Sequence, residues 1–419
     1  MAKANFSDPE GLTLGKVQFP SDDSEPTRLA NAIIINIRDD LNNLPEALLE
    51  LLTKVIKPLF SGGHPRVTPA GRKLAYTSPP TLPHSLPTSI HEEPSWRLPL
   101  TAPLLRWILK AYRSLCQPQR RQVLEAQFPF LVPPILNLID DVPSSSRADG
   151  FSLLQLLCDT IAYAESDILK RTGLIDVCFD AIKSNFMLLP TLTSEEESIQ
   201  VLKQLYPAAL ALIRARFSVT PGKPMDKLGK IPPQNSVLLD EEDQRQKYLK
   251  IILRHGLLAS LTHLGVGSSI SHVSLTTLLL SQLTLTVKAM GLAAVALLNH
   301  LIPMLRSILI DPFALSVPDL LLTALDAMGT MIKTCSPRIK DIWWSECLYG
   351  VVGCWCNILD DEEDTKKQPT LILVKDRVRA ITQTLSETVD AEEWQKAVTA
   401  LCREDKDMER LFNPARQHE

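Results

Sequence analysis

The residue types best suited to catalysis or metal binding are the eight histidines and eight cysteines of the chain. His255, His263 and His272 look clustered in the sequence. If one helix carries His255 and His263, however, its rise of about 1.5 Å per residue separates them by about 12 Å, too far for one metal ion. His300 stands alone in an apolar stretch. We therefore predict that these histidines are ordinary core or surface residues and do not form a metal site.

Three cysteines near the C-terminal end of the chain, Cys347, Cys354 and Cys356, could also act as ligands. No second Cys-x-x-Cys pair and no paired histidine accompanies them at the spacing of a zinc site. Cys347 and Cys354 share a helical face with Trp343, which predicts packing contacts. Glycine-rich phosphate loops, nucleophile elbows, HExxH and kinase signatures are absent. We therefore predict no catalytic, cofactor-binding or metal residues and no enzymatic activity.

Composition and charge point to a globular protein. The chain has 419 residues, 45% of them hydrophobic, which is enough for a large core. Its 44 basic and 48 acidic residues give a formal net charge of -4, so charge offers no argument for nucleic acid or membrane partners. Most cysteines are scattered singly on apolar faces, as reduced thiols are, and Met1–Gly15 lacks a signal pattern. We expect a cytoplasmic and nuclear protein.

The most hydrophobic region, Leu275–Ile310, raises the question of a membrane span. Lys288, Asn299, Pro303 and Arg306 interrupt it. No window of about 18 residues is free of strongly polar groups, as a spanning helix requires. We therefore predict a core helix instead of a transmembrane segment.

The elements that must position these residues are predicted to be helices throughout. Apolar residues recur at helical spacing over Met290–Leu359, and prolines divide this stretch into three helices. The third helix has two apolar stripes, which indicates neighbours on both sides. No period-two alternation flanked by hairpin turns argues for a sheet. We predict an all-α fold, an α-solenoid of HEAT-like or armadillo-like helical repeats.

Shifts in composition divide the chain into segments. Prolines after residue 61 forbid continuous helix, and a second break is rich in Pro, Gly and Lys. The predicted organisation is a flexible tail at 1–27, a helical pair at 28–60, a Pro-rich loop at 61–100, a helical-repeat segment at 101–218, a linker at 219–239 and a second helical-repeat segment at 240–419. Trp96 is expected to anchor the Pro-rich loop to the body.

A weak internal repeat supports stacked helical hairpins. Pro133 and Asp141 frame one apolar helix, and Pro303 and Asp311 frame another in the same way. A proline bends the outer helix, and an aspartate in the turn can accept backbone amides and cap the next helix. Arg147 follows Asp141 and is expected to bridge to the aspartate of a neighbouring unit. This pattern resembles the HEAT repeat.

The segment Pro337–Leu348 contains Pro-Arg-Ile followed by two tryptophans, and the apolar helix after it ends near Trp355. This region resembles the C-terminal part of the Tel-two-interacting-protein-two family. Upstream, Trp96 and the Leu98-Pro99-Leu100 step before Trp107 are similar too. The resemblance covers about 100–419 and is specific around Pro337–Trp355, whereas the first 100 residues match nothing recognisable.

The resemblance implies a non-enzymatic scaffold subunit, the smallest of the Triple-T (TTT) complex. Such a subunit binds the large HEAT-repeat subunit of the complex and, with the third subunit and the Hsp-ninety chaperone system, supports the maturation and stability of phosphatidylinositol-kinase-like kinases. It also implies a role in the DNA damage response. Neither nucleic acid nor membrane is an expected partner.

Within the family-like motif we expect a structural core of Pro337, Ile339, Trp343, Leu348 and Trp355. Arg338 and Lys340 begin a helix, where the helix dipole disfavours cations. We expect a carboxylate to offset them, either from a neighbouring repeat, which we prefer, or from the partner.

Two other functions stay open at this point. A HEAT or armadillo-like adaptor would bind peptide segments in a groove, in transport or assembly, and would carry a ladder of exposed Asn, Trp or acidic residues at repeat spacing. We see no such ladder. A helical enzyme could assemble its site from scattered residues, which a bound cofactor or metal would reveal.

Overall fold

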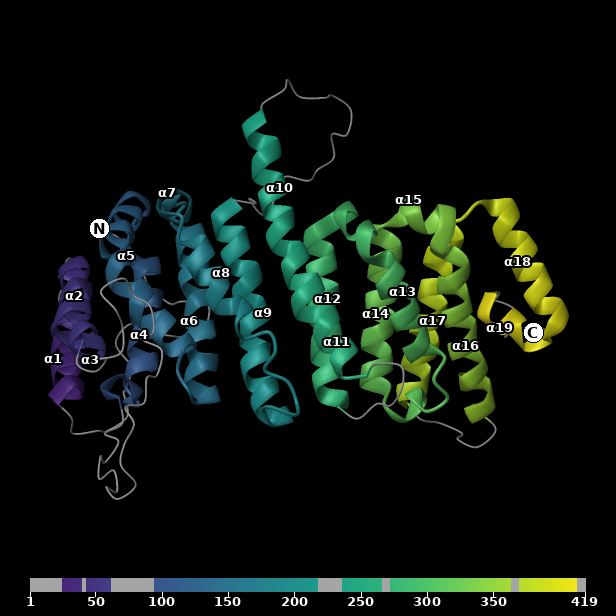
Figure 1. The fold of residues 1–419 in the computed structure, drawn as a ribbon, viewed down its shortest axis with the longest axis horizontal. Coiled ribbons are helices and arrows are strands. Elements are labelled where there is room, and N and C mark those ends of the chain that lie inside the picture. The colour runs from purple at the N-terminus through teal and green to yellow at the C-terminus, as the bar shows by residue number, and fades with distance from the viewer. Residues whose placement is uncertain are drawn as a thin grey trace, which may run out of the picture. The chain divides into compact units, whose positions relative to one another are not determined.

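A computed structural model describes residues 25–39, 43–61, 94–217, 236–265, 272–362 and 369–412. Every regular element in these ranges is a helix, which confirms the predicted all-α helical-repeat fold (Figure 1). Most of the predicted tail, Pro-rich loop and 219–239 linker lies outside the described residues. The chain divides into two compact units, Met1–Cys178 and Phe179–Glu419, and residues 219–239 fall within the second.

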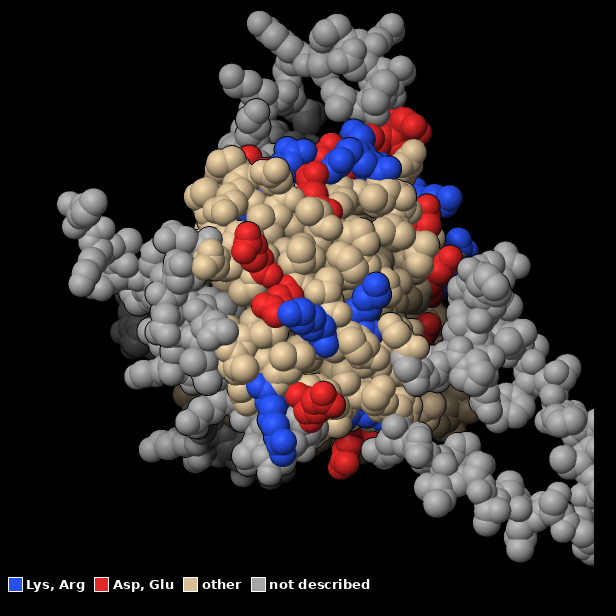
Figure 2. All heavy atoms as spheres, turned by 90° about the vertical axis from the view of Figure 1, so that its left-hand side faces the viewer, with Lys and Arg blue, Asp and Glu red and all other residues tan. Residues whose placement is uncertain are grey.

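The first unit is built from short helical hairpins. Its elements are α1 (Glu25–Asp39), α2 (Leu44–Glu50), which continues through a π-helical turn at Leu51–Ile56 into α3 (Lys57–Ser61), then α4 (Thr101–Ala111), α5 (Gln117–Ile139), α6 (Ser144–Tyr163) and α7 (Ile168–Thr172). α6 packs against α4 and α5. Trp96 is buried and stacks on Phe60 with ring centroids 5.8 Å apart, as expected of an anchor. On the face of this unit in Figure 2, charges of both signs are interspersed.

The second unit has two layers of helices. After α8 (Ile175–Lys183), its elements are α9 (Glu195–Phe217), α10 (Ser236–Ile251), α11 (Ala259–His263), α12 (Val273–Met290), α13 (Leu298–Leu309), α14 (Pro318–Thr334), α15 (Ser336–Arg338), α16 (Trp344–Glu362), α17 (Pro369–Thr388), α18 (Ala391–Glu404) and α19 (Glu409–Phe412). α9, α12, α14 and α17 pack side by side in one layer, and α13 packs on α16 in the other (Figure 1).

The run Val273–Leu309 is long and apolar enough to cross a membrane, judged by length and composition alone. A core helix of a globular protein passes the same test. In α12 the side chains of Leu275, Leu279 and Leu283 are 0% exposed. At Gly291 the backbone turns to a φ of +61°, and a 3-10 stretch follows. We therefore describe α12 as a core helix of the second unit.

The predicted HEAT-like turn between α5 and α6 is organised by Asp141, whose side chain is only 4% exposed. Arg97 donates two hydrogen bonds to its carboxylate, from Nε to Oδ2 at 3.0 Å and from Nη2 to Oδ1 at 2.6 Å. The Val142 amide donates to Oδ1 at 2.9 Å. Arg147 does not bridge to another unit as predicted. Its Nε instead donates to the Asp141 carbonyl at 2.6 Å, so Arg147 holds its own turn together.

The second copy of the turn is simpler. Asp311 accepts a hydrogen bond from the Phe313 amide at 2.9 Å, and its carbonyl accepts one from the Asn357 side chain at 3.1 Å. Pro133 and Pro303 lie inside α5 and α13, as predicted for the outer helices of such hairpins. The aspartate in each copy therefore organises its own turn.

Gly150 lies where α6 runs against the end of α5. A Cβ atom at this position would be 2.7 Å from the Ile139 amide nitrogen and 3.0 Å from the Leu138 carbonyl carbon. Backbone atoms cannot rotate aside, so we expect Gly150→Ala to destabilise the first unit by about 1–3 kcal/mol. This cost should outweigh the gain of about 1 kcal/mol that alanine brings to a helix. Urea unfolding followed by circular dichroism measures it.

Gly329 in α14 is the matched control. A Cβ there meets Ile381 Cγ1 at 3.5 Å, an ordinary contact. Gly329→Ala should therefore leave stability unchanged or raise it. Equal effects at the two glycines would contradict the close packing of α6 on α5.

Candidate partner-binding surfaces

The family-like motif is partly core and partly surface. Ile339, Leu348 and Trp355 are 0%, 6% and 1% exposed. The prediction that Pro337 and Trp343 belong to the same core needs correction, because Pro337 is exposed and Trp343 is only half-buried. A π-helical turn at Ile339–Trp343 explains the position of Trp343, whereas Pro337 lies at the exposed start of the helix before that turn. The wider π-helical turn shifts the side chains that follow Ile339 away from the register of an α-helix.

Arg338 and Lys340 both point to solvent. We preferred an ion pair with a neighbouring repeat, but neither side chain forms one in the part of the chain that the structure describes. Both cations lie at the beginning of a helix, where the positive end of the helix dipole raises the free energy of a positive charge. Within the described ranges, no carboxylate therefore pairs with either charge.

These cations border an exposed ridge on α15 and α16. Arg338, Ile342, Ser345 and Tyr349 follow one another at helical spacing and are all exposed. Ile342 is 48% and Tyr349 is 59% exposed. Arg306 of α13 pairs with Glu346 and lies with its guanidinium carbon 5.5 Å from the Tyr349 ring centroid. We call Arg338, Ile342 and Tyr349, together with the adjacent exposed Lys340, the α16 ridge, which runs from α15 through the π-helical turn into α16. It exposes an aliphatic, an aromatic and an arginine side chain, and aromatic and arginine residues are enriched in protein-binding surfaces.

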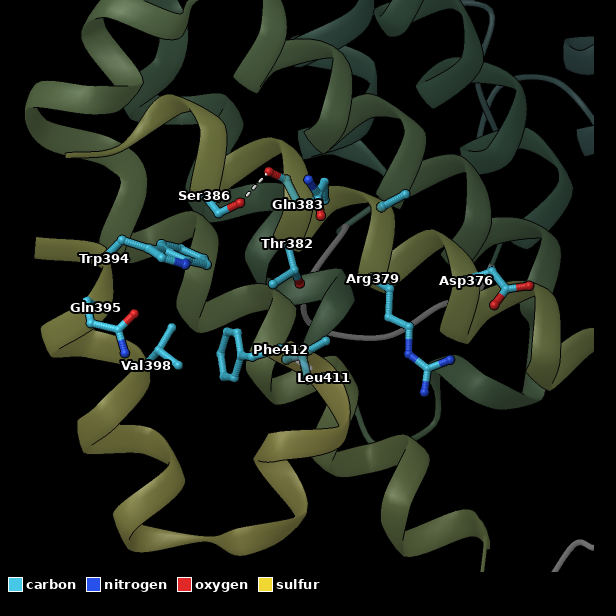
Figure 3. A pocket seen from close by; sticks show the side chains of 11 residues that line it. Asp376, Arg379, Thr382, Gln383, Ser386, Trp394, Gln395, Val398, Leu411 and Phe412 are labelled. Carbon is cyan, nitrogen blue, oxygen red and sulfur yellow. Dashed lines mark hydrogen bonds between the residues drawn. The ribbon is translucent and has the colours of Figure 1, made fainter. Parts of the chain in front are cut away.

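A cleft of about 460 Å³ opens between α17, α18 and α19 (Figure 3). Trp394 and Phe412 meet edge to face at 6.0 Å on its apolar wall, which Val398 extends. The opposite wall carries the polar side chains of Thr382 and Ser386 on α17. No residue of α18 is fully buried. The cleft can accept apolar side chains of another polypeptide, but nothing in its lining selects one.

The histidines and cysteines that were considered as possible ligands do not form a cluster among the described residues. Among the described residues, no group of three or more His, Cys, Asp or Glu side chains is placed to hold a metal ion. Burial raises the pKa of Cys354 to about 12, and burial together with the charge of Glu346 raises that of Cys347 to about 12. His272 Nδ1 lies 2.9 Å from Glu195 Oε2, and His263 Nε2 lies 3.3 Å from the Pro190 carbonyl oxygen. The two histidines thus contact residues far away in the sequence, and the two cysteines are buried.

Sequence reasoning singled out Arg338 and Lys340 but missed Ile342, Tyr349 and the cleft. Tyr349 and Ile342 stand among apolar neighbours that are buried, so their types gave no signal. Only the π-helical turn, which periodicity cannot reveal, determines which of them face solvent.

Comparison with known proteins identifies the family. The model of the Tti2 family matches residues 17–316, well over half of the chain. No curated protein and no solved structure matches it. The match corrects the extent of the resemblance, since it includes most of the first 100 residues and ends before Pro337. The tryptophan-rich motif on which the resemblance was based lies outside the matched residues. This chain belongs to the Tti2 family, that of Tel-two-interacting protein two.

Proposed function

We propose that this protein is a non-enzymatic scaffold subunit of the TTT complex that binds the large HEAT-repeat subunit. In that assembly it supports Hsp-ninety-dependent maturation and stability of phosphatidylinositol-kinase-like kinases, in the cytoplasm and the nucleus. Family membership supports the role as a complex subunit. The stacked helical hairpins of each unit supply extended surfaces of the kind that helical-repeat proteins use for binding.

We propose that the α16 ridge is the surface that binds the large HEAT-repeat subunit. Within the described residues Arg338 and Lys340 have no ion-pair partner, and they precede the exposed Ile342 and Tyr349 along the helix. A partner with acidic residues around an apolar patch would neutralise the cations and bury the apolar area. Such complementarity contributes to both the rate and the specificity of association.

Reversing the two charges tests this surface. We expect Arg338→Glu/Lys340→Glu to reduce the large HEAT-repeat subunit recovered by co-purification by about tenfold, because two attractive charges become repulsive. The melting temperature should not fall, since neither side chain forms an ion pair within the described residues and glutamates suit the beginning of a helix. Immunoblotting of the recovered subunit and a thermal melt give the two readings.

Lys203→Glu/Lys247→Glu is the matched control. Both lysines are exposed in the second unit, and neither is ion-paired within the described residues. The control has the same net charge and should retain the partner. Partner loss in both variants would show a general charge effect, and a lower melting temperature with the partner retained would assign Arg338 and Lys340 a structural role. Mass spectrometry of the same pull-down checks for the kinases, and recovery of transport cargo instead would contradict the proposed function.

A further inference from the structure

A second surface lies on the other layer of the second unit, across α12, α14 and α17. These three helices are adjacent (Figure 1). A groove of about 380 Å³ runs over them. Three cations line it: Lys288 from α12, Lys333 from α14 and Arg377 from α17. Among its lining residues the one carboxylate is Asp326. The groove therefore carries excess positive charge in a chain whose formal net charge is -4.

One ion pair within the groove neutralises one of its three cations, and the other two have no ion-pair partner among the described residues. Arg377 Nη1 lies 2.7 Å from Asp326 Oδ1, so these two charges neutralise each other. Lys288 and Lys333 are exposed and have no ion-pair partner in the part of the chain that the structure describes. Two ammonium groups that share one groove repel each other until an anion lies between them.

Hydroxyl groups add further donors. Thr284 and Thr384 donate to the carbonyls of Leu280 and Ala380 in their own helices, at 3.0 and 2.9 Å. The hydroxyls of Thr330 and Thr334, which also line the groove, make no hydrogen bond within the described residues. Helical threonines usually bond back to the carbonyl of the preceding turn. These two side chains can therefore donate to a ligand without breaking a bond in their helix.

The groove also has small residues at its centre. Gly329 and Ala380 line it between the charged positions. Small side chains let the backbone of a bound segment approach the helices closely. A ligand in this groove would therefore contact small residues at the centre and ammonium and hydroxyl donors on either side.

We infer that this groove binds an acidic segment of a protein partner, rich in aspartate and glutamate. Carboxylates accept from both ammonium and hydroxyl donors, and several carboxylates along one segment can reach Lys288 and Lys333 together. The surface extends over three repeats, which suits an elongated segment better than a small anion. This inference goes beyond the proposed function, because the groove and the α16 ridge lie on different layers and can fail separately.

Fluorescence anisotropy tests the groove with the full chain and a short labelled peptide of aspartate and glutamate. The matched peptide of asparagine and glutamine should bind much more weakly. We expect Lys288→Glu/Lys333→Glu to raise the Kd of the acidic peptide by about tenfold, which equals about 1.4 kcal/mol. Thr330→Val/Thr334→Val, which keeps the shape and the charge, should raise it by a smaller factor.

Lys203→Glu/Lys247→Glu controls for net charge and should bind the acidic peptide as the unmodified chain does. Equal losses in the control and groove variants would overturn the proposal, as would equal binding of the two peptides. Binding of a serine-phosphorylated peptide but not of the carboxylate peptide would also overturn the proposal. Displacement of the bound acidic peptide by an equal concentration of a single-stranded DNA oligonucleotide would overturn it as well. Because the assay contains no other TTT subunit, its outcome is independent of the co-purification result for the α16 ridge.

Discussion

Replacing Trp355 by alanine is expected to lower the free energy of unfolding by about 3–5 kcal/mol, the cost of truncating a buried tryptophan. Trp355 is 1% exposed in α16, which packs against α13 and α17. The guanidinium carbon of Arg379 on α17 lies 5.2 Å from the centre of its ring. Truncation removes this contact and leaves a cavity between helices. Urea unfolding followed by far-ultraviolet circular dichroism measures the loss.

Two variants separate packing from other causes. The indole N–H of Trp355 is buried and has no hydrogen-bond partner among the described residues. Trp355→Phe should therefore cost far less than Trp355→Ala, since it keeps most of the ring and loses no hydrogen bond. Trp343→Ala should also cost less, because Trp343 is half-buried. If Trp343→Ala proved as damaging as Trp355→Ala, the assigned burial of the two rings would be incorrect.

The contrast between these two tryptophans shows how far periodicity carries a prediction. Apolar spacing predicted helices over α13, α14 and α16, because burial of one face imposes a repeat of about 3.6 residues. It placed Ile339 and Trp355 correctly in the core. It failed at Trp343, where the backbone follows a π-helical turn whose hydrogen bonds leave no mark on residue type.

Surfaces were harder to predict than the core. Arg338 and Lys340 attracted attention because they begin a helix, but whether a carboxylate faces them depends on how helices pack. The groove joins Lys288, Lys333 and Arg377 from three helices. Each lysine alone reads as an ordinary solvated side chain. Only packing of α12, α14 and α17 brings their charges together, so local spacing could not reveal the groove.

The same limit applies to Asp141. Its turn was recognised from the repeat pattern, and the nearby Arg147 was expected to bridge to the aspartate of a neighbouring unit. The actual partner is Arg97, 44 residues away in the sequence. Helices α4 and α5 separate the two residues along the chain, so their pairing follows from tertiary structure alone.

Asp141→Asn is expected to destabilise the first unit by about 3 kcal/mol at neutral pH, because it leaves Arg97 without its carboxylate. Asparagine keeps the size of the side chain and an oxygen that can accept from the Val142 amide. The loss therefore reports mainly on the charge pair. Urea unfolding of the full chain, followed by circular dichroism, gives its size.

The pH dependence of this difference identifies the cause. Burial raises the pKa of Asp141, but the Arg97 hydrogen bonds, the Val142 amide, the charge of Arg97 and the Ser146 side chain outweigh it and hold the pKa below its ordinary value. A carboxyl group with a lowered pKa in the folded state stabilises the protein above its unfolded pKa, near 4, and loses this effect as pH falls through the folded value. The unmodified chain should therefore lose its advantage over Asp141→Asn in acid.

Other carboxylates contribute to acid unfolding, since the pKa of Glu125 is also lowered. Burial raises it, but hydrogen bonds from Ser166, Arg121 and Arg171 outweigh that effect. Comparing the two proteins at each pH cancels this contribution, because Asp141→Asn leaves Glu125 unchanged. A difference that stayed constant from neutral pH into strong acid would mean that shape, and not charge, holds the turn together. A difference that shrinks only in acid assigns the stability of the α5–α6 turn to the Arg97–Asp141 pair.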